Sequence, residues 1–71
     1  MNLIMSKHAL EQARERGVSI NEIKETISKG AKFLQQEKII AKHRHIKIVF
    51  KKIKGKYFII TVMMRTEKNG K

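Results

Sequence analysis

The run from Tyr57 to Arg65 constrains the fold more than any other stretch of this chain. It is rich in β-branched and aromatic residues, and turn-forming residues flank it at Gly55 and at Asn69-Gly70. Such a run predicts a strand that is apolar on both faces. Because side chains alternate along a strand, we expect helices to cover one purely apolar face and function to lie on the other, mixed face. The apolar face is predicted to carry Phe58, Ile60, Val62 and Met64, and the mixed face Tyr57, Ile59, Thr61, Met63 and Arg65.

Two helices are predicted upstream of this strand by their end signals. Ser6 suits the N-cap of a helix over residues 7–16, which Gly17 would end at its C′ position. Ser19-Ile20-Asn21-Glu22 has the form of a capping box and begins a second helix, which Gly30 closes. Their apolar stripes comprise Ala9, Leu10 and Ala13 in the first helix and Ile20, Ile23 and Ile27 in the second.

After Ala31 the apolar residues recur every second position, which is typical of strands. We expect strands over 31–35, 38–43 and 46–51, and a glycine-containing hairpin turn that leads into the strand at 57–65. Short connections favour pairing between consecutive strands. The prediction is a single α+β domain over 1–71, with two N-terminal helices packed on one face of a four-stranded antiparallel meander sheet (α-α-β-β-β-β). Residues 66–71 are expected to form a frayed polar tail.

The charge of the chain is strongly positive and concentrated in its second half. The formal net charge is +11, and residues 38–71 hold eleven lysines and arginines against one acid, Glu67, which gives +10. A one-sided basic field of this size indicates a polyanionic partner, with nucleic acid first. The residues predicted to bind it are Lys42, His43, Arg44, His45, Lys47 and Lys51, of which Lys47 and Lys51 are expected on the sheet face that no helix covers.

Several classes of site and location are made unfavourable by the composition. The chain has no cysteine, which excludes disulfides and thiolate metal sites and fits a reducing cytoplasm. His43 and His45 lack nearby carboxylates, so a zinc site is not expected, and we predict no metal or cofactor. The apolar runs are too short to cross a bilayer, and residues 1–6 are too short for a signal peptide. We therefore expect a cytoplasmic protein without a membrane partner.

Four short segments together resemble a known family: Ser6-Lys7-His8-Ala9-Leu10, Arg14-Glu15-Arg16-Gly17-Val18-Ser19, Glu22-Ile23 and Ile59-Ile60-Thr61-Val62. They resemble a prokaryotic family of small domains of unknown function whose first helix has the form S-x-H-A-L … R-G-V-S. That family is grouped, at the level of fold, with the RelE-like and barnase-like ribonucleases, many of which are toxins of toxin–antitoxin pairs. The resemblance implies a metal-independent endoribonuclease of the mRNA interferase type, with an acidic antitoxin protein as partner. The chain departs from the pattern at Gln12, where many members carry arginine, so one cation is missing.

Cleavage of RNA without a metal needs a proton acceptor, a proton donor and cations for the phosphorane charge. With the resemblance as the guide, the predicted catalytic residues are His8 as acid or base, Arg16 and Arg65 on phosphate, and Thr61 as a hydroxyl donor. Each also has a structural interpretation, as a packing histidine, a solvated arginine, a strand-end residue or a β-branched strand residue. Two other functions remain open: a non-catalytic RNA- or DNA-binding module, and a protein-interaction domain whose apolar open sheet face docks a partner or a second copy of the chain.

Overall fold

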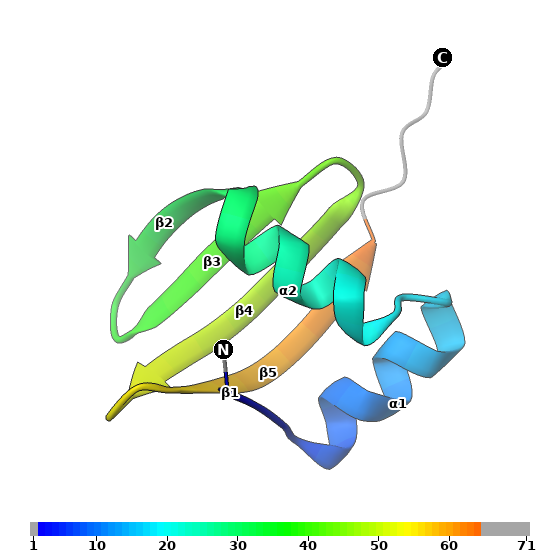
Figure 1. Ribbon diagram of the computed structural model, residues 1–71, viewed down its shortest axis with the longest axis horizontal. Helices are drawn as coiled ribbons and strands as arrows, with labels where there is room; N and C mark the ends of the chain where they lie inside the picture. The colour runs from blue at the N-terminus through cyan, green and yellow to red at the C-terminus, as the bar shows by residue number, and fades with distance from the viewer. Residues whose placement is uncertain (1, 65–71) are drawn as a thin grey trace.

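The computed structural model describes residues 2–64 and combines helices with a mixed sheet (Figure 1). The elements within this range are β1 (Asn2–Met5), α1 (Lys7–Arg16), α2 (Ile20–Lys29), β2 (Ala31–Gln35), β3 (Lys38–His43), β4 (Ile46–Ile53) and β5 (Lys56–Met64). The strands lie in the order β1-β5-β4-β3-β2. Consecutive strands from β2 to β5 pair antiparallel, whereas β1 pairs parallel with β5.

The prediction of a four-stranded antiparallel meander is therefore wrong, although the chain does combine helices and strands in the α+β manner. The sheet has a fifth strand, β1, which brings Leu3 opposite Tyr57 and Met5 opposite Ile59 in a parallel register. The four residues of β1 are too few for an alternation pattern to identify them. Their partner lies at the other end of the chain, so a long-range contact and not local sequence decides that they form a strand.

Both predicted helices are present and begin at the predicted caps. The backbone N–H of Ala9 donates to Ser6 Oγ (3.0 Å) at the start of α1, and Gly17 ends this helix in the left-handed conformation with φ 68°. The capping box of α2 is formed: Glu22 N–H donates to Ser19 Oγ (3.1 Å), and Ser19 N–H donates to Glu22 Oε1 (2.8 Å). These signals act within one helical turn, which is why sequence alone locates them.

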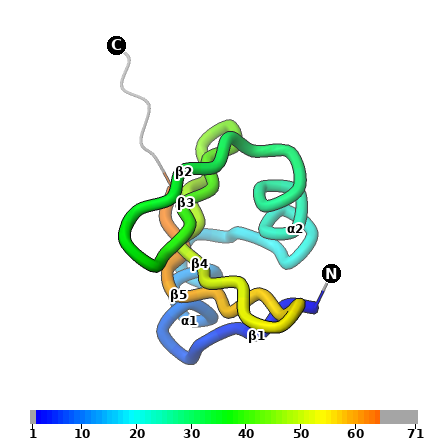
Figure 2. Tube along the Cα trace, turned by 90° about the vertical axis from the view of Figure 1, so that its left-hand side faces the viewer, coloured from blue at the N-terminus to red at the C-terminus, as the bar shows by residue number. Residues whose placement is uncertain are grey.

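The core lies between the helices and one face of the sheet. α2 contacts β3 and β4, and α1 contacts β5 and β1. Figure 2 shows α2 standing to one side of the β3 and β4 strands. Gly30, at the end of α2, permits this close approach, because a Cβ there would collide with the backbone carbonyl oxygens of Thr26 and Lys42. The buried apolar residues are Ala9, Ala13, Val18, Ile23, Ile27, Ala41, Ile46, Ile48, Phe50, Ile59 and Val62.

A β-bulge in β5 changes which residues face this core. Val49 pairs with Thr61 but the next residue, Phe50, pairs with Ile59, so Ile60 is an extra residue in the strand. The prediction for Val62 is confirmed, since it is fully buried. The predictions for the other half of the strand are wrong: Ile59 is 1% exposed in the core, and Tyr57 packs against the core. Simple alternation fails because it assumes that no residue is inserted.

Two further residues of the predicted apolar face are also corrected by the bulge. Phe58 pairs with Lys51 and so lies on the face opposite the core, and Ile60 is half-buried at the bulge itself. Met64 pairs with buried Ile46 and so lies on the predicted face, but it is 44% exposed at the end of β5. The predicted helix cover is therefore not observed for these three residues.

Neither helix within residues 2–64 combines the length and apolar character that a membrane span requires.

Candidate nucleic-acid interface on the open sheet face

The face of the sheet opposite the core carries rows of side chains that run across the strands, and we call it the open face. Its middle row is apolar apart from a threonine, and lysines stand on both sides of that row. The middle row is Phe33, Ile40, Val49 and Thr61, one from each of β2, β3, β4 and β5. In the row on one side, Lys47 of β4 lies between its two partners, Lys42 of β3 and Met63 of β5. The row on the other side contains Lys38, opposite Gln35, and Lys51, opposite Phe58.

The open face has no negative charge of its own. None of the five strands contains an aspartate or glutamate. The ion pairs within residues 2–64 join Arg16 to Glu15 and Lys29 to Glu25, so the lysines of the open face have no carboxylate partner in that range. Lys42, Lys47 and Lys51 are half-buried, which is expected when aliphatic stems lie along an apolar surface and the ammonium groups reach solvent. The ammonium of Lys42 lies 5.4 Å from the ring centroid of Phe33.

A shallow pocket of about 300 Å³ indents this face near the β2–β3 turn. It is lined by Gln35, Gln36, Lys38, Ile40, Lys47 and Val49. The pocket therefore combines two amide side chains and two ammonium groups with an apolar base. Such a lining offers hydrogen-bond donors to an anion and an apolar surface to the flat side of a base.

The structure confirms that Lys47, Lys51 and Thr61 lie on the open face, and it divides the predicted Lys42–His45 cluster. Lys42 also lies on the open face. Arg44 and His45 form the exposed β3–β4 turn, where Arg44 adopts φ 58°. His43 instead pairs with buried Ile46, so it faces the helix side of the sheet, away from the lysines of the open face. Its Nε2 atom is buried without a hydrogen-bond partner in the described part of the chain, and its contact with nucleic acid stays a prediction.

The predicted catalytic residues lie around the edge of β5. Pairing between β1 and β5 ends at Ile59, and beyond that point α1 lies along the strand. The backbone N–H of Val62 donates to Gln12 Oε1 (3.1 Å), so α1 satisfies a donor that a neighbouring strand would otherwise satisfy. His8 is exposed one helical turn before Gln12, on the same side of the helix. The structure thus brings the helix that carries His8 to the strand that carries Thr61.

The other members of the predicted catalytic set are less closely grouped. Arg16, in the last turn of α1, is exposed and lies 3.6 Å from a carboxylate oxygen of Glu15. Arg65 lies outside the described residues. Within the described range, no hydrogen bond joins the side chains of His8, Arg16 and Thr61 to one another. Gln12, where the resemblance led us to expect arginine, accepts the hydrogen bond of the Val62 N–H at the edge of the strand.

Sequence reasoning missed Lys38 as a member of the open face. Lys38 and Lys42 are four residues apart in one strand, and alternation places them on the same face. This signal was available once β3 was located. Which residues of β4 and β5 lie beside Lys38, however, depends on the β3–β4 register, which the sequence did not supply.

In residues 2–64, no three side chains of the His, Cys, Asp and Glu types gather where they could hold a metal ion.

The comparison with protein families gives one assignment. A family model for DUF4258, a domain of unknown function, matches residues 5–64. The match spans α1 through β5 and includes the N-terminal motif around His8, so the chain belongs to this family of domains of unknown function. Neither the curated proteins nor the solved structures gave a match to the chain.

Proposed function

We propose that this protein is directed to RNA and that its open face binds the phosphate backbone. The observation that carries the proposal is the pair of lysine rows on either side of the apolar middle row, on a sheet whose strands contain no acid. Lysines positioned in this way neutralise phosphates and release their counterions, which supplies most of the free energy of sequence-independent binding. The middle row, with Phe33 at its end, offers a surface against which unpaired bases can pack.

The proposed activity is metal-independent RNA cleavage of the RelE-like type. In this reaction the ribose 2′-oxygen attacks the adjacent phosphorus and the bond to the 5′-oxygen of the next nucleotide breaks. The products carry a 2′,3′-cyclic phosphate and a 5′-hydroxyl. His8 accepts the 2′-hydroxyl proton or donates the proton that the 5′-oxygen needs, and Arg16 and Arg65 stabilise the phosphorane charge. The position of α1 along β5 supports this proposal, because the helix that carries His8 lies beside the strand whose Thr61 faces the bound backbone.

The proposed biological setting is the cytoplasm, where an acidic antitoxin protein would cover the basic surface. A non-catalytic nucleic-acid-binding module uses the same lysine rows and differs only in lacking cleavage. It is favoured by the lack of a hydrogen bond between His8 and Thr61 within the described residues. The assays below separate these two functions.

Binding is tested by the salt dependence of RNA affinity. The dissociation constant for a short single-stranded RNA should rise steeply with salt concentration. The double variant Lys42→Gln/Lys47→Gln should flatten that dependence, with a slope lower by about 0.7 for each lysine removed from a phosphate. The matched control is Lys7→Gln/Lys24→Gln, which removes the same charge from the exposed surfaces of α1 and α2. Equal effects of the two double variants would refute the open face as the binding surface.

Cleavage is tested by incubating the protein with RNA in the presence of EDTA and analysing the ends of the products. The wild-type protein should produce 2′,3′-cyclic phosphate ends, and His8→Ala should cleave about 10²–10⁴-fold more slowly with unchanged binding. Glu11→Ala is the control, since it changes an exposed residue of the same helix to which no role in binding or cleavage is assigned. Binding without cleavage by the wild-type protein would identify the non-catalytic module. Unchanged cleavage by His8→Ala would refute the catalytic role of His8.

A further inference from the structure

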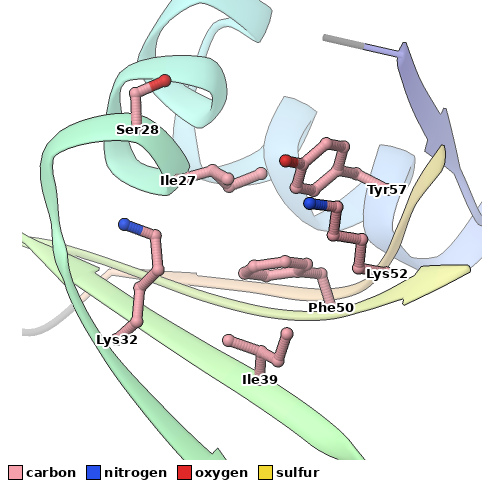
Figure 3. Close-up of a pocket in the computed structure, with 7 residues that line it drawn as sticks. All are labelled: Ile27, Ser28, Lys32, Ile39, Phe50, Lys52 and Tyr57. Atoms are coloured by element: carbon pink, nitrogen blue, oxygen red, sulfur yellow. The ribbon is translucent and has the colours of Figure 1, made fainter. Parts of the chain in front are cut away.

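A second hollow, of about 440 Å³, lies on the helix side of the sheet and so on the face opposite the proposed RNA surface. The helices leave the β4–β5 hairpin end of that face uncovered (Figure 1). Figure 3 shows the residues around this hollow, which come from α2 and from four strands. They are Ile27, Ser28, Lys32, Ile39, Phe50, Lys52 and Tyr57.

The base of the hollow is a rigid apolar surface. Phe50 and Ile27 are 1% and 2% exposed and belong to the core, so they cannot move away from the hollow without disturbing the fold. The rings of Phe50 and Tyr57 lie with their centroids 5.6 Å apart at an angle of 42°. Ile39 extends the same apolar surface. Because Phe50 and Ile27 expose almost no surface, the apolar surface that a flat ring can reach is that of the half-buried Tyr57 and Ile39, which Phe50 and Ile27 support from beneath.

The rim of the hollow is cationic and rich in donors. Figure 3 shows Lys32 and Lys52 on different sides of the hollow, on β2 and β4, with the Tyr57 hydroxyl pointing toward Ile27. The Lys52 ammonium lies 5.4 Å from the Tyr57 ring centroid, and the Lys32 ammonium donates to the Gly30 carbonyl oxygen (3.3 Å). No acid lines the hollow, and neither lysine forms an ion pair within residues 2–64. Two uncompensated cations over an apolar base favour an anionic ligand.

We propose that this hollow binds a small phosphorylated ring compound of the nucleoside monophosphate class. The base of the nucleotide packs against Tyr57 and Ile39, and the phosphate accepts hydrogen bonds from Lys52 and the Tyr57 hydroxyl, while the Lys32 ammonium adds positive charge at the other side of the rim. The volume lies within the ordinary range for small-molecule sites, about 300–1,000 Å³. This inference does not depend on RNA binding at the open face, because the residues involved are different and lie on the other side of the sheet.

The test uses Tyr57 as a reporter, because it is the only tyrosine in the chain. Adenosine monophosphate should shift the NMR resonances of the Tyr57 ring in a saturable manner. Adenosine, which lacks the phosphate, and inorganic phosphate, which lacks the ring, should each bind at least about tenfold more weakly, the ratio expected when one charged hydrogen bond or its equivalent is lost. Equal affinity for phosphate alone would show an adventitious anion site and overturn the proposal.

Neighbouring lysines provide a matched pair of variants. Lys52 faces the hollow, whereas Lys51 lies on the open face opposite Phe58. Lys52→Gln should weaken adenosine monophosphate binding about tenfold. Lys51→Gln removes the same charge and should leave the affinity unchanged. Equal loss in both variants would show non-specific attraction by net charge and would overturn the assignment of the site.

The same chemistry occurs in a free nucleotide and at the phosphorylated end of an RNA strand. Adenosine monophosphate and a short RNA with a terminal phosphate should therefore be titrated side by side. A Tyr57 shift with the mononucleotide supports a free nucleotide as ligand, and a shift with the RNA alone supports the strand end. No shift with either compound overturns the proposal.

Discussion

The two faces of the sheet use lysine in different ways. On the open face, lysines form cross-strand rows beside a flat apolar middle row, which suits an extended polyanion. On the helix side, Lys32 and Lys52 stand at the rim of a hollow whose base belongs to the core, which suits a compact anion. The adjacent residues Lys51 and Lys52 lie on opposite faces of the sheet. The lysines of one strongly basic chain can therefore be divided between two proposed sites, and the register of strand pairing decides to which site each lysine belongs.

The bulge at Ile60 determines how β5 is shared between these faces. It leaves Thr61 and Met63 on the open face and turns Tyr57 and Ile59 toward the helix side. Without the extra residue, Tyr57 would lie on the open face, and the hollow would lose its tyrosine ring and hydroxyl. The following predictions test this division, from the largest expected effect to the smallest.

Replacing Ile59 tests which side of β5 is buried. Ile59→Ala should lower the free energy of unfolding by about 2–5 kcal/mol, because it leaves a cavity where the side chain is now 1% exposed. Ile60→Ala removes the same atoms from a half-buried site at the bulge and should cost less. Urea denaturation followed by circular dichroism measures both values. A larger loss for Ile60→Ala would mean that alternation continues through β5 without a bulge.

Replacing Gly30 tests the close approach of α2 to the sheet. Gly30→Ala should destabilise the protein by about 1–3 kcal/mol, because the new methyl group meets the carbonyl oxygens of Thr26 and Lys42. The helix must then move away from β3, which would also widen the hollow beside Ile27. Asn21→Ala, at an exposed position of the same helix, is the control. A thermal melt in which both variants match the wild-type protein would contradict the tight contact.

Replacing Gln12 tests the contact between α1 and the edge of β5. Gln12→Ala should lower the free energy of unfolding by about 0.5–1.5 kcal/mol, because the Val62 N–H loses its acceptor. Amide hydrogen exchange at Val62 should accelerate, which separates this effect from a general loss of stability. Glu11→Ala, at an exposed position of α1, should leave the exchange rate at Val62 unchanged.

The smallest expected effect compares the two faces through one charge each. For an RNA without a terminal phosphate, Lys51→Gln should lower the slope of log affinity against log salt concentration by about 0.7. Lys52→Gln should leave that slope unchanged, in contrast to its expected effect on adenosine monophosphate. Fluorescence anisotropy over a series of salt concentrations measures both slopes. A reversed order would assign RNA to the helix side.

Local signals predicted much of this structure, and long-range contacts account for what was missed. The caps at Ser6 and Ser19 located both helices because each acts within one turn. The strands over 31–35 and 38–43 were predicted because their apolar residues recur at every second position, which is a local signal. β1 was missed because its partner Tyr57 is remote in sequence, and the bulge because it depends on how β5 meets β4 and α1.

For the candidate sites too, local signals predicted some residues correctly and long-range contacts explain those that were missed. Lys47, Lys51 and Thr61 were placed correctly on the open face, since alternation in β4 and in the last part of β5 is regular. His43 was grouped with its sequence neighbours, although adjacent residues in a strand point to opposite faces. The hollow was not predicted at all, because it depends on where α2 ends above β4 and on the reversal of Tyr57.

The parallel pairing of β1 with β5 also has a consequence for how the chain reaches this fold. Each of the turns from β2 to β5 closes a short loop, whereas Leu3 and its partner Tyr57 are 54 positions apart in the sequence. Closing such a loop is slow compared with forming helices and hairpins. During synthesis β1 emerges first but finds its partner last, and until then β5 has an unpaired edge that can capture other strands. We therefore expect β5 to form early, in its hairpin with β4, and its edge to be covered by β1 only in a late step of folding.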